Sequence, residues 1–172
     1  MKVLKGIIGV LALGLLAFVG VGFLLSGEWS AERARVLEAT PEVIFPYLED
    51  LEQWRQWSSM AQVEGQLSAP SRGPGATLTW DDAQWGAGRF ELLRVGPLQW
   101  VEYRVSVEDG SMETRGRIQL EEGAEGTTVT WREEGDFGWN PLLSYFALGM
   151  ERMQGEELDK ALDRLQGLVA CR

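Results

Sequence analysis

The sequence of 172 residues contains no histidine, one cysteine and six prolines. Without histidine the chain has no Ser-His-Asp triad, no imidazole base for proton transfer near neutral pH, and lacks the usual protein ligand of zinc and iron. Because the one cysteine is Cys171, neither a disulfide nor a paired-cysteine redox motif can form within the chain. We therefore expect no metal ion and no cofactor.

Basic residues are also scarce, with 16 Lys and Arg against 26 Asp and Glu, and the formal net charge is −10. This balance argues against a nucleic-acid partner, because phosphate binding needs clustered basic side chains. What the sequence does have is eight tryptophans and an apolar content of 45%. The length suits one domain with a full-sized core.

Much of the apolar content is concentrated in residues 6–25, a run without a charged or polar side chain that follows Lys2 and Lys5. A helix of this length reaches ~30 Å, the thickness of a bilayer core. A cleaved signal peptide is the alternative, although its apolar region is normally shorter, ~7–15 residues. We predict a transmembrane anchor over residues 1–29, with Trp29 at the bilayer edge. The basic N-terminus is expected to stay in the cytoplasm, which places the domain of residues 30–172 on the exported side.

The rest of the chain alternates between helical and strand patterns. Ser30–Ala39 reads as a linker running into a short strand, and Thr40-Pro41-Glu42 is a strong helix start. From Gln62 to Asp136 apolar and polar residues alternate between tight turns, which is typical of an antiparallel meander. Asn140-Pro141 then opens a long amphipathic helix. We predict an α+β fold in which a curved antiparallel sheet of about six or seven strands wraps around this C-terminal helix.

Four segments carry a resemblance to a known family: Thr40–Asp50, Trp54 to Ser58, Gly126–Trp131 and Asn140–Met153. In these the sequence resembles the SRPBCC superfamily (START-like, helix-grip fold), and within it the membrane-anchored proteins described as polyketide cyclase-like. The resemblance covers residues 33–170. It implies a helix-grip fold with a cavity between the sheet and the C-terminal helix.

In that fold the inward-facing residues line the cavity, although each of them can instead simply fill the core. The predicted ligand-binding residues are Trp54, Trp57, Leu78, Trp80, Phe90, Tyr103, Trp131, Tyr145, Phe146, Met150 and Met153. Several Trp, Tyr and Met side chains together favour an adaptable apolar pocket. We predict a membrane-tethered domain that binds an apolar small molecule or a lipid. A variant of this prediction adds transfer of the bound molecule.

The main alternative is a polyketide cyclase- or hydrolase-like enzyme that uses a cavity carboxylate and a tyrosine. Among the acids at strand ends, Glu133 alternates in step with Val129 and Trp131 and so faces inward with them. It is therefore the best candidate for a general base. The binding hypothesis needs no catalytic residue. A third hypothesis is a protein-interaction or envelope-stress module with a vestigial pocket, and the sequence does not identify its protein partner.

Overall fold

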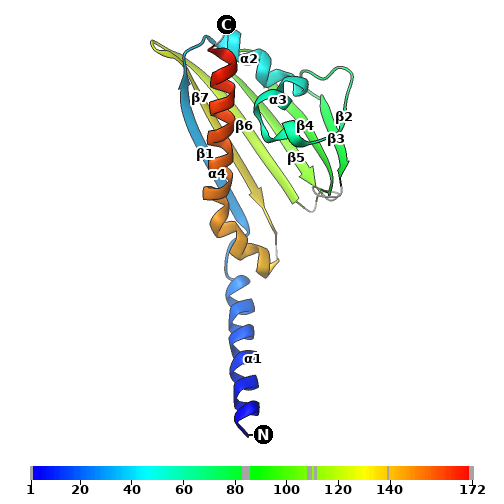
Figure 1. Ribbon diagram of the computed structural model, residues 1–172, viewed down its shortest axis with the longest axis vertical. Coiled ribbons are helices and arrows are strands. Elements are labelled where there is room, and N and C mark those ends of the chain that lie inside the picture. Colours follow the sequence, from blue (N-terminus) through cyan, green and yellow to red (C-terminus); the bar gives the residue numbers. More distant parts are fainter. Residues whose placement is uncertain (1, 83–85, 108–109, 111, 139, 171–172) are drawn as a thin grey trace.

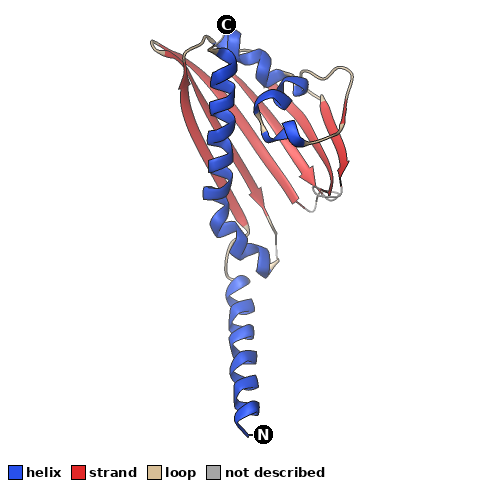
Figure 2. Cartoon of the chain, in the orientation of Figure 1, coloured by secondary structure: helices blue, strands red, loops and turns tan. Residues whose placement is uncertain are grey.

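The computed structural model describes residues 2–82, 86–107, 110, 112–138 and 140–170. Its strands form an antiparallel sheet in the order β1-β7-β6-β5-β4-β3-β2, and the sheet curves around the helices that follow the first strand, which lie on one of its faces (Figures 1 and 2). The strands are β1 (Glu28–Leu37), β2 (Gln66–Leu67), β3 (Thr77–Asp82), β4 (Gly86–Gly96), β5 (Trp100–Val107), β6 (Met112–Gly123) and β7 (Gly126–Asp136). The helices are α1 (Lys2–Gly22), α2 (Pro41–Glu49), α3 (Leu51–Trp57), the 3-10 turn η1 (Ser59–Gln62) and α4 (Pro141–Val169). This arrangement confirms the predicted α+β, helix-grip-like architecture.

Strands β2 to β7 follow one another as the predicted meander, with apolar residues directed to the helix side. In β7, for example, Val129, Trp131 and Glu133 are buried and Arg132 between them is exposed. The linker and short strand expected over Ser30–Ala39 form instead a ten-residue strand, β1, paired with β7 along its whole length. The long partner strand explains the difference, because every residue of β1 finds a hydrogen-bonding neighbour on β7.

On this face, helix α4 covers the half of the sheet that contains β1 and β7. Helices α2 and α3 cover the rest of the same face (Figure 1). Asp50 begins α3 by accepting a hydrogen bond from the Glu52 amide at 3.0 Å. At Gly155, α4 comes so close to β1 that a Cβ atom there would clash with the guanidinium of Arg33. Arg33 in turn donates from Nε to Asp159 Oδ2 at 3.0 Å. Gly155 thus leaves room for the Arg33 guanidinium, and the Arg33–Asp159 ion pair joins the long helix to the edge strand.

Helix α1 extends away from the domain and meets it at the beginning of α4 (Figure 1). The Phe18 ring stacks on Tyr145 with a centroid separation of 4.3 Å, and the Tyr145 hydroxyl donates to the Phe18 carbonyl at 2.6 Å. Helix α1 ends at Gly22, before the apolar run does. In the described part of the chain no helix is both long and apolar enough to cross a membrane, so the transmembrane helix predicted for residues 6–25 is not found.

Trp29 also lies elsewhere than the sequence suggested. It belongs to β1, where it is paired with Gly135 of β7 and is only 9% exposed. The absence of a side chain at Gly135 lets the indole lie across the neighbouring strand. The ring is therefore part of the sheet rather than a marker of a bilayer edge.

Candidate functional site

Five of the aromatic residues predicted to line the cavity meet on the concave face of the sheet. The ring centroid of Trp54 lies 4.8 Å from that of Phe90 and 5.0 Å from that of Tyr103. Trp131 lies 5.8 Å from Trp54 and 5.3 Å from Trp57. Both indole N–H groups from α3 donate to main-chain carbonyls of α2. All five rings are buried, so they fill the middle of the interior.

A chain of buried polar groups runs beside this cluster. The Tyr103 hydroxyl accepts a hydrogen bond from Trp131 Nε1 at 2.7 Å and donates to Glu133 Oε1. The second carboxyl oxygen of Glu133 accepts from Gln154 Nε2 of α4 at 2.5 Å. Tyr103, Gly116 and Glu133 are opposite one another on β5, β6 and β7, and the phenol ring lies across the bare Gly116. The network therefore joins the sheet to α4.

Burial changes the proton affinity of this network. Removal from water raises the pKa of the Glu133 carboxyl above its ordinary value, and the hydrogen bonds from Tyr103 and Gln154 oppose that rise. Burial and the neighbouring Glu133 charge hold the pKa of Tyr103 well above its usual range. Glu133, the candidate base from the sequence, thus has a buried position, a tyrosine partner and an increased affinity for a proton.

Next to Glu133 is a small, partly open hollow of about 40 Å³, which we call the carboxyl cavity. It lies between the sheet, the α3–η1 connection and α4. The residues that line it are Trp54, Ser58, Ser59, Met60, Phe90, Tyr103, Val105, Trp131, Glu133, Gln154, Glu157, Leu158 and Ala161. A water molecule occupies ~30 Å³ in the liquid, so this cavity holds about one water and no larger ligand.

A larger hollow lies at the end of the sheet nearest α1, between β5, β6 and the first turns of α4; we call it the apolar groove. Its volume is about 350 Å³. Most of its lining is apolar: Trp29, Val105, Val107, Met112, Phe137, Leu143, Phe146 and Met150, with Glu113, Thr114 and Asp136 as the polar members. Val105 lines both the groove and the carboxyl cavity, so the two spaces are neighbours. The groove has the size and character of a small-molecule site.

The remaining predicted residues are dispersed. Phe146 and Met150 line the groove, whereas Tyr145 contacts α1 and Met153 is 53% exposed. Leu78 and Trp80 of β3 are buried in the core and line neither space.

Several groove residues were not singled out from the sequence. Val107 and Met112 are paired with each other at the end of the β5–β6 ladder and lie on the same inward face as Val105. Leu143 lies three and seven residues before Phe146 and Met150, on the same side of α4. These spacings were the signal that could have identified the groove.

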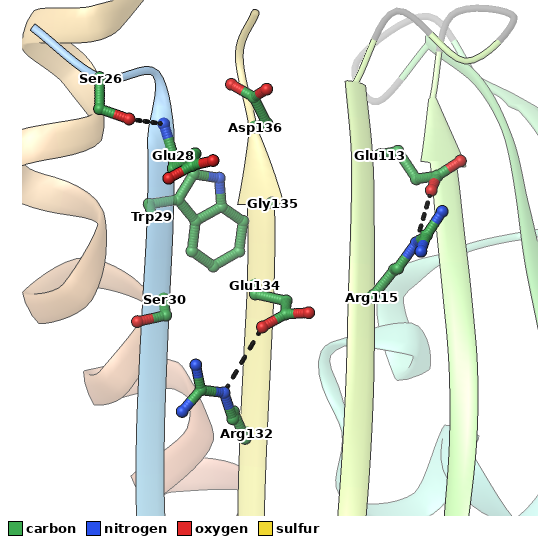
Figure 3. Close-up of a pocket in the computed structure, with 10 residues that line it drawn as sticks. All are labelled: Ser26, Glu28, Trp29, Ser30, Glu113, Arg115, Arg132, Glu134, Gly135 and Asp136. Carbon is green, nitrogen blue, oxygen red and sulfur yellow. Dashed lines mark hydrogen bonds and ion pairs between the residues drawn. The ribbon is translucent and has the colours of Figure 1, made fainter.

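A polar hollow lies at the same end of the sheet as the groove, and its charged side chains have the outward strand register of Arg132 (Figure 3). Its volume is about 720 Å³, and its lining is Ser26, Glu28, Trp29, Ser30, Glu113, Arg115, Arg132, Glu134, Gly135 and Asp136. Trp29, Glu113 and Asp136 line both spaces. Although four acids line the polar hollow, no group of three or more His, Cys, Asp or Glu in the described part is arranged to hold a metal ion.

Solved structures share this fold at low sequence identity. SA2116 from Staphylococcus aureus, a protein of unknown function, is 9% identical with a TM-score of 0.64, over 85% of this chain and 96% of its own. The di-domain ARO/CYC protein StfQ of the steffimycin biosynthetic pathway is 11% identical with a TM-score of 0.62, over 83% of this chain and 51% of its own. DynU16, from the dynemicin biosynthetic locus, is 18% identical with a TM-score of 0.58, over 82% and 47%. The chain thus spans about half the length of StfQ and DynU16.

No curated protein matches the sequence. The family model described as "Polyketide cyclase / dehydrase and lipid transport" matches residues 28–170, which is nearly the whole domain and includes all strands and α2 to α4. The resemblance drawn from the sequence motifs is thereby confirmed at the level of the family. The chain belongs to the polyketide cyclase / dehydrase and lipid transport family.

Proposed function

We propose that this chain binds an apolar small molecule or lipid in the apolar groove between the sheet and α4. A variant of this proposal adds transfer of the bound molecule. The observation that carries the proposal is the groove itself, in which eight of the eleven lining residues are apolar. Phe146 and Met112 at its rim are 54% and 38% exposed. Large apolar side chains gathered around a hollow are typical of a ligand site, because a bound apolar molecule removes their surface from water.

The volume limits the size of the ligand. If each non-hydrogen atom of a bound chain takes about the ~30 Å³ of a liquid water molecule, the groove holds on the order of a dozen such atoms. A single acyl or alkyl chain of medium length or a small ring system fits this space, and a complete two-chain phospholipid does not. The family description, which combines cyclases with lipid transport, agrees with an apolar ligand.

One observation favours the second candidate, an enzyme that uses a cavity carboxylate and a tyrosine. Glu133 and Tyr103 are in direct hydrogen-bond contact, and Val105 separates them from the groove. A substrate reaching past Val105 would meet a carboxyl group with a raised proton affinity. The small volume of the carboxyl cavity is the reason why we place binding without catalysis before the enzyme hypothesis.

We also propose that residues 6–25 hold the domain at a membrane, with the N-terminus in the cytoplasm and the domain exported. Val10, Leu11 and Leu16 of α1 are 68% to 71% exposed, and a lipid environment would cover this apolar surface. Lys2 and Lys5 precede the run, which favours a cytoplasmic N-terminus. A C-terminal reporter active only outside the cytoplasm tests this orientation, and activity confined to a cytoplasmic reporter would refute it.

The binding proposal is tested by methyl NMR of the full chain labelled with ¹³C-methyl methionine and held in nanodiscs of zwitterionic lipid. Met112 and Met150 report on the groove, and Met60 reports on the carboxyl cavity. Addition of octanol is expected to shift the Met112 and Met150 signals and leave Met60 unchanged. A shift of Met60 instead would favour the carboxyl cavity, and the absence of any shift would refute binding.

A bulky substitution in the groove supplies the matched control. Met112→Trp is expected to fill the groove and to abolish the octanol-induced shift of Met150. Val36→Trp places the same side chain at a similarly exposed position, 46% for Val36, at the other end of β1. This variant is expected to bind octanol like the unmodified chain.

A further inference from the structure

The exposed side of helix α4 changes character along its length. In residues 141–148 the exposed side chains are apolar: Leu142, Phe146 and Leu148 are 60%, 54% and 70% exposed. In residues 156–169 every exposed side chain is charged, namely those of Glu156, Glu157, Lys160, Asp163 and Arg164. Residues 137–150 contain no charged residue, in a chain with a formal net charge of −10. Large apolar side chains exposed at one end of an otherwise charged helix mark a contact surface.

The same turns of α4 are packed against the end of α1. The Phe18 ring stacks on Tyr145 with a centroid separation of 4.3 Å. Gly22, the last residue of α1, lies so close to Pro141 that a Cβ atom at Gly22 would clash with it. The start of α4 is therefore a part of the domain that meets α1 (Figure 1). A lipid environment that covers the apolar side chains of α1 also reaches those of the first turns of α4.

The depth of α4 in such an environment follows from this contact. Phe18 is four residues before the end of α1 at Gly22, which is ~6 Å along the axis of a helix. Where lipid covers α1 up to its end, the Tyr145 ring on Phe18 is thus ~6 Å inside the lipid boundary. Amphipathic helices that lie on a membrane are buried to a similar depth, ~5–10 Å.

The polar side chains of this part of α4 have partners within the chain. The Tyr145 hydroxyl donates to the Phe18 carbonyl at 2.6 Å. The Ser144 hydroxyl donates to the Asn140 carbonyl at 3.2 Å. Asn140 Oδ1 in turn accepts a hydrogen bond from the Leu142 amide at 3.0 Å. Because an unpaired polar group is costly in an apolar medium, these hydrogen bonds suit the start of α4 to contact with lipid.

The mouth of the apolar groove lies at the same place. Leu143, Phe146 and Met150 of α4 line the groove, and Met112 of β6 lines it from the sheet. Phe146 is both a lining residue and one of the exposed apolar side chains of α4. An apolar molecule at the mouth of the groove is therefore next to the side chains that would contact lipid.

We propose that Leu142, Phe146 and Leu148 form a bilayer face, by which the domain lies on the membrane, and that the apolar groove opens through this face into lipid. The ligand is then an apolar molecule dissolved in the membrane, and it enters the groove without passing through water. This inference rests on the proposed binding function and on the proposed membrane attachment of residues 6–25. Glu28 and Asp136, paired at the end of the sheet nearest α1, disfavour anionic headgroups, so the bilayer that fits is zwitterionic.

The test measures the accessibility of a nitroxide label on the full chain, in zwitterionic nanodiscs that carry at most one chain each. The label is attached to Leu142→Cys in a chain with Cys171→Ser. The matched control carries Val36→Cys instead, because Val36 is 46% exposed and is paired with Thr128 at the end of β1 remote from α1. The ratio of oxygen to nickel-chelate accessibility should be at least about fivefold higher at Leu142, because lipid takes up oxygen and excludes the chelate.

The outcomes separate this inference from the proposals on which it rests. Equal ratios at Leu142 and Val36, on chains that remain in the discs, overturn the bilayer face and leave the membrane attachment intact. Loss of the chains from the discs overturns both. Protection of Leu142 that appears only in discs with several chains identifies a second copy as the partner and overturns the bilayer. Binding in the groove is read separately, from the octanol-induced shifts.

A lipid with a nitroxide on its acyl chain tests whether the groove opens into the bilayer. In discs that contain this lipid, the methyl signals of Met112 and Met150 should broaden and that of Met60 should stay sharp. Leu148→Glu should reduce the broadening of Met150 at least about twofold, because a charged side chain is costly in lipid. Val36→Glu makes the same change of charge at a remote exposed site and should leave the broadening unchanged. Sharp Met112 and Met150 signals, or equal broadening of Met150 in the two variants, would overturn the opening into lipid.

Discussion

The substitution Tyr103→Phe tests the buried network most sharply, because it removes one hydroxyl and no carbon atom. That hydroxyl accepts from Trp131 Nε1 at 2.7 Å and donates to Glu133 Oε1, and Trp131 and Glu133 are only 4% and 6% exposed. The variant leaves the Trp131 N–H without its acceptor, which costs about 1–3 kcal/mol when the group is buried. It also removes a hydrogen bond to an ionisable carboxyl group, worth about 1.5–3 kcal/mol. We expect a total loss of about 3–5 kcal/mol in the free energy of unfolding.

The assay is urea denaturation of the full chain followed by tryptophan fluorescence. Tyr145→Phe is the matched control, since its hydroxyl donates to the Phe18 carbonyl at an exposed site on the α1–α4 contact. Its expected loss is below about 1 kcal/mol, because exposed groups regain water as a partner. A loss for Tyr103→Phe as small as that of the control would refute the view that this buried network stabilises the fold.

Three further predictions follow from the same structure. Because the pKa of Glu133 is raised in the folded state, the proton it binds contributes stability that is complete below the unfolded-state pKa of about 4.3 and is lost as the pH rises through the folded value. The free energy of unfolding of Glu133→Gln, relative to that of the unmodified chain, should therefore increase as the pH rises from 4 to 8. A difference that stays constant over this range would refute the raised pKa. Gly116→Ala should destabilise the fold by about 1–3 kcal/mol or more, measured by urea denaturation, because its Cβ would overlap the Tyr103 ring; a neutral effect would contradict the close approach. Gly149→Ala and Gly167→Ala meet no atom within 4 Å of the new Cβ, so each should raise the melting temperature through up to about 1 kcal/mol of helix propensity, and a decrease would show a packing role.

The order of the elements was predictable because local patterns decide it. The alternation of Val101, Tyr103 and Val105 requires a strand with one buried face, and the Asn140-Pro141 start requires a helix at the end of the chain. The inward direction of Glu133 also followed from strand parity. Each of these features depends on the backbone period and on neighbours within a few residues.

The position of the ligand space was not predictable, because it depends on how side chains from distant elements fit together. Strand parity placed Trp131 inside and the family resemblance placed Trp54 at the cavity, and only the packing shows that their rings leave about 40 Å³ there. The rotation of α4 likewise depends on its packing against distant elements, and it leaves Met153 53% exposed. The free space lies at the end of the sheet, next to Trp29.

The most direct test of the central claim is to locate a bound ligand by anomalous diffraction. Crystals of the full chain soaked with 8-bromooctanol should contain a bromine peak in the apolar groove, between Met112 on β6 and Met150 on α4. A bromine peak in the carboxyl cavity beside Glu133, or none on the concave face of the sheet, would contradict the groove as the binding site.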